Sequence, residues 1–113
     1  MATAKQRIRH LIQTYRRNFG AMVKAQGGLC AGQAVVVEFR DRQPECIVHM
    51  GSTILLMRYA RRIAPEVGKA FARAIHLSKP GQAPAICLYM RAPGDVAAAI
   101  MVVDLKVRQN EPK

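Results

Sequence analysis

The most reactive side chains of this chain are three cysteines and three histidines, which occur singly along the sequence. Cys30 lies in the glycine-rich segment 27–32, where nearby basic residues could activate a thiol. Catalysis by that thiol would also need a histidine, and no local signature ties one to Cys30. A zinc site would need about four ligands, which usually arrive in close pairs. We therefore expect no catalytic residue, no metal site and no cofactor; a small enzyme that uses Cys30 or a histidine is the alternative.

Asp104 is the most unusual of the acids, because it stands in an apolar stretch that is typical of a strand. An edge position in a sheet, or an ion pair with a nearby arginine, explains such a residue more simply than a general base does. The glycine-rich loops with a terminal lysine that cradle nucleotide phosphates do not occur in the sequence. Neither carboxylate catalysis nor this kind of phosphate site is indicated.

Positive charge is the dominant chemical feature of the sequence. The chain has 18 lysines and arginines against 7 acids, which gives a formal net charge of +11 at pH 7. The first acidic residue is Glu38, and six cations precede it. Between Ser52 and Lys79 six further cations stand against one acid, Glu66. Such an excess favours a polyanionic partner through long-range attraction and counterion release.

These cations are concentrated in segments that we expect to be helices. Solvent-facing helices usually mix both signs of charge, because ion pairs four residues apart stabilise them. A basic helix face can simply be solvated, but without acids we interpret it as a surface that follows phosphates. We expect ten residues to contact phosphates: Lys5, Arg9, Arg16, Arg17, Lys24, Arg58, Arg61, Arg62, Lys69 and Arg73. This interpretation requires that they converge into one patch.

The sequence thus predicts a small non-enzymatic nucleic-acid-binding protein. DNA or structured RNA, contacted through its backbone, fits better than single-stranded RNA, whose bases stack on sheet aromatics. Phe39 and Tyr89 are the only aromatic residues on expected strands. A helix-turn-helix at Pro65 is a poor match, because the turn there is too tight. A protein-binding adaptor, or an inhibitor of a larger nucleic-acid-handling complex, is the alternative.

The elements that would carry these side chains follow from apolar spacing and from turn residues. Apolar residues recur at three- and four-residue steps over 4–26, which predicts a surface helix. Ser52 or Thr53 can cap a second helix, and Pro65 suits the first position of a third, with one kinked helix as the alternative. The expected helices are 4–26, 53–64 and 65–77, and the expected strands are 34–40, 45–50, 85–91 and 96–108.

The order helix, hairpin, helix pair, hairpin predicts an α+β fold with one long N-terminal helix and a mostly antiparallel four-stranded sheet. The apolar side of the third helix, Ile75 included, should face that sheet. Two stretches of the strands, 35–37 and 100–103, are apolar at consecutive positions, so both faces of the sheet should be covered. Helices on both faces or a homodimer would each explain this pattern.

At 113 residues the chain fits one compact domain, 1–113, in which 109–113 should be a frayed tail. No apolar run approaches the roughly 20 residues that span a bilayer, so no membrane partner is expected. An odd number of widely spaced cysteines cannot form a complete disulfide framework, which favours a reducing, cytoplasmic compartment. An arginine-rich first segment without acids is also typical of a mitochondrial transit peptide, which is the alternative for 4–26.

Overall fold

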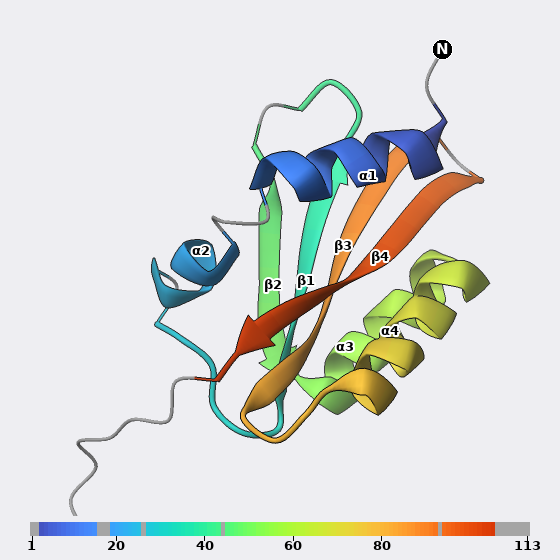
Figure 1. Ribbon diagram of the computed structural model, residues 1–113. Helices are drawn as coiled ribbons and strands as arrows, with labels where there is room; N and C mark the ends of the chain where they lie inside the picture. The colour runs from blue at the N-terminus through green and yellow to red at the C-terminus, as the bar shows by residue number, and fades with distance from the viewer. Residues whose placement is uncertain (1–2, 16–18, 26, 44, 93, 106–113) are drawn as a thin grey trace, which may run out of the picture.

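The computed structural model describes residues 3–15, 19–25, 27–43, 45–92 and 94–105. It has a four-stranded sheet between two layers of helices (Figure 1). The strands are β1 (Gln33–Arg40), β2 (Ile47–Ser52), β3 (Gln82–Ala92) and β4 (Asp95–Asp104). The helices are α1 (Ala4–Tyr15), α2 (Phe19–Ala25), α3 (Thr53–Ile63) and α4 (Pro65–Leu77). The α+β class and the predicted alternation of helices and strands are confirmed, whereas the predicted tail, 109–113, lies outside the described residues.

The sheet is mixed, with its strands in the order β2-β1-β3-β4. Both outer pairs are antiparallel, as the sequence predicts, with Val36 opposite His49 and Ile86 opposite Ile100. The central pair, β1 with β3, is parallel. The antiparallel strand β2 ends at the edge of the sheet where β1 begins, with Ser52 opposite Gln33. The helices α3 and α4 then carry the chain past β1, and β3 starts beside the start of β1 and runs parallel to it.

The N-terminal region contains two helices, α1 and α2, rather than the single helix expected over 4–26. Figure 1 shows α1 lying across the strands, where it buries Ile8 and Leu11. Val23 of α2 packs into the same core. An unbroken helix over the whole region would be about 33 Å long, whereas four strands are only about 15 Å wide. Its second half would therefore extend past the sheet, and Val23 would lie beyond the core.

Each face of the sheet has a core of its own, because alternate residues of β1 point to opposite faces. Val35 and Val37 pack with α1, whereas Ala34 and Val36 pack with α3 and α4. Phe71 of α4 is fully buried in the second core, and burial of such a side chain contributes about 2 kcal/mol. Helices on both faces therefore explain the apolar run 35–37 of β1. In the run 100–103 of β4, by contrast, Val102 is 68% exposed, so the prediction that this stretch is covered on both sides is wrong there. The homodimer stays a prediction.

The helices α3 and α4 form a hairpin whose connection is the single residue Ala64. Its backbone is extended, at φ −169° and ψ 155°, because the residue before a proline is driven out of the helical region. Pro65 then begins α4, as the sequence predicts. Ser52 caps α3 by accepting a hydrogen bond from the amide of Leu55 at 3.2 Å. No helix in the described part of the chain is long and apolar enough to cross a membrane.

Candidate functional site

The cations that were expected to contact phosphates are divided between the two faces of the sheet. Lys5 and Arg9 project from α1 and Lys24 from α2, and all three are exposed. Five more are exposed on α3 and α4, which cover the opposite face: Arg58, Arg61, Arg62, Lys69 and Arg73. Arg16 and Arg17 lie outside the described residues. The expectation of one shared patch is therefore wrong, because the sheet itself separates the two groups.

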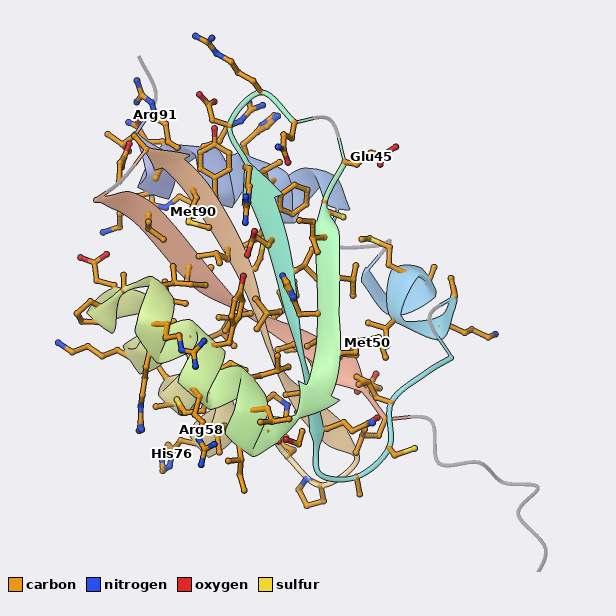
Figure 2. The ribbon with its side chains drawn as sticks, turned by 180° about the vertical axis from the view of Figure 1, so that it is seen from behind. Glu45, Met50, Arg58, His76, Met90 and Arg91 are labelled. Atoms are coloured by element: carbon orange, nitrogen blue, oxygen red, sulfur yellow. The ribbon has the colours of Figure 1, made fainter. Side chains whose placement is uncertain are left out.

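The five cations of α3 and α4 belong to one surface, because these helices pack closely side by side. Gly68 of α4 is buried, and a Cβ added there would meet the Cγ of Arg61 at 3.0 Å. This close approach joins the last turn of α3 to the first half of α4 and fixes how the two antiparallel helices lie against each other. Figure 2 shows Arg58 and His76 at the same end of the helix pair. We call the five cations the hairpin surface.

No carboxylate among the described residues lies within ion-pair distance of the hairpin surface. The ion pairs in that part of the chain join Arg40 and His49 to Glu38, Arg42 to Asp41, and Arg91 to Asp95. Glu66 lies in the first turn of α4, where a negative charge stabilises the helix dipole. Arg61 and Arg62 lie in the last turn of α3, where each contributes about 0.5 kcal/mol in the same way. Part of this charge therefore has a structural role, but most of it faces water.

The open end of this hairpin, where α3 begins and α4 ends, carries exposed apolar side chains. Ile54 and Leu55 are 68% and 61% exposed, and Ile75 and Leu77 are 37% and 52% exposed. The prediction that Ile75 faces the sheet is wrong. It is 37% exposed and lies seven residues after Gly68, on the stripe of α4 that faces α3. We call these four residues the apolar end.

Glu38 is a buried polar residue whose burial the sequence interpretation missed. Its side chain has no exposed surface. Arg40 donates a hydrogen bond from Nε at 2.7 Å, and the hydroxyl of Tyr59 donates another. The Nε2 of His49 lies 3.4 Å from a carboxylate oxygen of Glu38. The run 35–37 was the available signal, because a strand that is apolar on both faces also buries the next residue along it.

The contacts of Glu38 keep its carboxylate ionised. Burial raises the pKa of Glu38, but the hydrogen bonds from Tyr59 and Arg40 and the charge of Arg40 outweigh burial and lower it overall. Burial, and then the hydrogen bond to Glu38, raise the pKa of Tyr59 to about 12. Because the carboxylate is enclosed by these groups, it cannot reach a substrate. The cluster instead links β1, β2 and α3.

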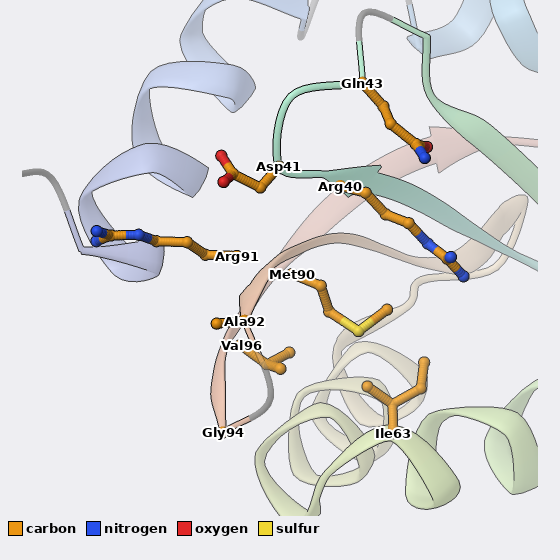
Figure 3. A pocket seen from close by; sticks show the side chains of 9 residues that line it. All are labelled: Arg40, Asp41, Gln43, Ile63, Met90, Arg91, Ala92, Gly94 and Val96. Carbon is orange, nitrogen blue, oxygen red and sulfur yellow. The ribbon is translucent and has the colours of Figure 1, made fainter.

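A shallow pocket of about 460 Å³ lies where the turns after β1 and β3 meet (Figure 3). Ile63, Met90 and Val96 provide its apolar wall. Arg40 and Arg91 also line it, but Figure 3 shows their guanidinium groups pointing in different directions. Both are paired, Arg40 with Glu38 and Arg91 with Asp95 at 3.9 Å. Ligand pockets usually have polar groups that converge on the ligand, whereas the arginines of this pocket do not converge.

The cysteines and acids that could carry other chemistry are dispersed. Among the described residues, no three histidine, cysteine or carboxylate side chains gather where they could hold a metal ion. Cys30 is exposed on the loop before β1. Cys87 is buried, which raises the pKa of its thiol to about 12 and makes it a poor nucleophile. Asp104 is exposed at the end of the edge strand β4, in the edge position that the sequence suggested.

No protein-family model, curated protein or solved structure matches this chain. The geometry of the hairpin surface and of the apolar end is therefore the basis on which a function can be argued.

Proposed function

We propose that this protein is a small non-enzymatic nucleic-acid-binding protein that contacts the phosphates of DNA or structured RNA through the hairpin surface. One observation carries this proposal. Five exposed cations stand on two adjacent helices, and no carboxylate of the described residues lies within ion-pair distance of them. Cations that are not paired with carboxylates can contact phosphates and release the counterions that are condensed on the nucleic acid. Its cytoplasmic location is part of the same proposal and is equally open to test.

The spacing of these cations suits a duplex. Arg58 and Arg62 are one helical turn apart on α3, and Lys69 and Arg73 are one turn apart on α4, about 6 Å in each case. Helices that pack side by side have axes roughly 8–10 Å apart. The result is two short rows of cations, separated by a distance comparable to the roughly 12 Å width of the major groove. Such rows can contact phosphates on both strands of a duplex.

Two triple variants with equal loss of charge test this surface. R58A/R62A/R73A removes cations from the hairpin surface, whereas K5A/R9A/K24A removes them from the opposite face. Each lowers the formal net charge from +11 to +8, since three cations are lost. Affinity for duplex DNA and for a structured RNA is measured by fluorescence anisotropy over a range of salt concentrations. For duplex DNA, the hairpin variant should reduce the slope of log K against log salt by about 2.7, and the other variant should leave it unchanged.

The matched pair separates a defined surface from attraction by net charge alone. Equal losses in the two variants would mean that only net charge matters, and a larger loss in K5A/R9A/K24A would assign binding to the face of α1 and α2. Either result overturns the hairpin surface as the site. Absence of binding by the unmodified protein at low salt would overturn nucleic-acid binding itself.

A further inference from the structure

We infer that the apolar end docks an acidic amphipathic helix of a partner protein. Its four members, Ile54, Leu55, Ile75 and Leu77, are large aliphatic residues, and three of them are more than half exposed. Exposed apolar residues that occur singly are normal on a soluble protein, but a contiguous group marks an interaction surface. This inference goes beyond nucleic-acid binding and does not depend on it.

The four side chains lie at the same end of the molecule because α3 begins and α4 ends there. The contact between Arg61 and Gly68 pairs the last turn of α3 with the first half of α4. Ile54 lies two turns before Arg61, and Ile75 lies two turns after Gly68. We therefore expect these two residues to be neighbours on the sides of α3 and α4 that face each other. Leu55 lies about 100° around α3 from Ile54, and Leu77 lies about 200° around α4 from Ile75, so both leucines lie to the side of the seam. A helix that lies across the open end of the hairpin, rather than along the seam, would contact side chains of both helices.

The charge around this group specifies the kind of partner. Arg58 lies four residues after Ile54 on α3, and Arg73 lies four residues before Leu77 on α4, so each cation stands one turn from an apolar side chain. His76, drawn at this end of the hairpin in Figure 2, is also exposed. A partner that covers the apolar end must therefore place acidic side chains around its own apolar stripe.

A second copy of this chain is a poor occupant of the same surface. Its net charge is +11, and the corresponding region carries arginines rather than acids. Pairing two hairpins would bring cations against cations around the apolar contact, which opposes association. An acidic helix supplies both the apolar surface and the complementary charge.

A synthetic peptide of about 18 residues serves as the probe, with leucine at positions i, i+3, i+4 and i+7, glutamate beside the leucines and helix-forming alanine elsewhere. Its fluorescein-labelled form is titrated with the full-length protein. We expect saturable binding, and we expect I54S/L77S to weaken it roughly tenfold or more, because two buried aliphatic contacts are lost. The control variant is Ile47→Ser, since Ile47 is 42% exposed but lies at the far end of β2 from the hairpin. Circular dichroism checks that each variant is folded.

A scrambled peptide of the same composition tests whether the apolar stripe matters, and vesicles that contain phosphatidylserine test whether the surface binds lipid instead. Weak binding of the scrambled peptide, together with the loss in I54S/L77S, supports the inference. It is overturned if both peptides bind alike, if Ile47→Ser weakens binding as much as I54S/L77S, if neither peptide binds, or if the protein binds vesicles but not the peptide. Because I54S/L77S keeps every cation, nucleic-acid binding should survive it, so the two proposals can fail separately.

Discussion

At the scale of single residues, Glu38 is the one charged group that is buried among the residues that the structure describes. It is a fully buried carboxylate in a chain that has 7 acids and 18 lysines and arginines. Its contacts with Arg40, Tyr59 and His49 join side chains from β1, α3 and β2. An ionised group is tolerated there because hydrogen bonds from Tyr59 and Arg40 offset much of its desolvation. The cluster thus holds α3 against β1 and β2.

We predict that Glu38 makes the protein less stable in acid. The folded-state pKa of Glu38 is lowered, so the unfolded chain binds its proton more readily. The stabilisation is therefore present above the unfolded-state pKa of about 4.3 and is lost as pH falls through the lower folded-state value. Glu38→Gln should lower the free energy of unfolding by about 2 kcal/mol near neutral pH, and the difference from the unmodified protein should shrink below about pH 4. Urea unfolding at a series of pH values measures both effects.

Glu45→Gln is the matched control, because Glu45 is exposed in the turn between β1 and β2 (Figure 2). It removes the same charge without removing a buried contact, so the free energy of unfolding should change by less than about 0.5 kcal/mol. If the two variants gave the same pH dependence, acid sensitivity would come from net charge, and the role assigned to Glu38 would be wrong.

At the scale of elements, Gly68 controls how closely α3 and α4 approach. A Cβ at this position would meet Arg61 Cγ at 3.0 Å and Arg61 Cα at 3.5 Å, which a small shift of the arginine can accommodate. We predict that Gly68→Ala changes the free energy of unfolding by less than about 1 kcal/mol, because gained helix propensity offsets the tight contact. Gly68→Leu should destabilise by about 2 kcal/mol, because its longer side chain must separate the helices.

Ala72→Leu provides the comparison for that series. Ala72 lies one turn after Gly68 on the same stripe of α4, but it is exposed. Leucine there has room to turn toward water, so thermal unfolding should differ little from that of the unmodified protein. An equal loss of stability from Gly68→Leu and Ala72→Leu would show that the helices are not held together at Gly68.

The local signals in the sequence predicted the elements well, and the contacts between distant segments less well. Pro65 and Ser52 act on their own turns, so the start of α4 and the cap of α3 could be predicted from neighbouring residues alone. The break between α1 and α2 depends on the width of a sheet formed by residues far along the chain. The parallel pairing of β1 with β3 likewise depends on the route of the crossover and not on either strand's composition.

At the scale of the whole molecule, the sequence identified which cations are exposed but not how they are distributed. Both basic helical regions have a polar face, and the spacing of the apolar residues alone predicts that Arg9 and Arg73 are exposed on these faces. Which face of the sheet each helix covers depends on the whole topology. Because α1 and α4 cover opposite faces, Arg9 and Arg73 lie on opposite sides of the sheet. The apolar end was missed for a similar reason. Ile75 has the spacing of a core residue, and only the packing of α3 against α4 shows that it lies on their seam.

The hairpin surface and the apolar end share part of the molecule, which leads to a prediction about both proposals. Arg58 and Arg73 belong to the hairpin surface and also flank the apolar end. A helix docked on the apolar end would therefore occupy two of the five cations proposed to contact phosphates. We predict that the acidic amphipathic peptide and duplex DNA compete. With free peptide at ten times its own Kd, the apparent affinity for DNA should fall roughly elevenfold if binding is exclusive.

Linkage requires the reverse effect, so saturating DNA should weaken peptide binding by a corresponding factor. The scrambled peptide, which has the same charge, controls for simple competition between polyanions and should displace much less DNA. Size-exclusion chromatography with distinct labels on peptide and DNA provides an independent readout. Coelution of both labels with the protein would mean that the two ligands bind different surfaces. Arg58 and Arg73 would then serve one ligand only, and the triple variant R58A/R62A/R73A would identify which one, because it would weaken the binding of that ligand alone.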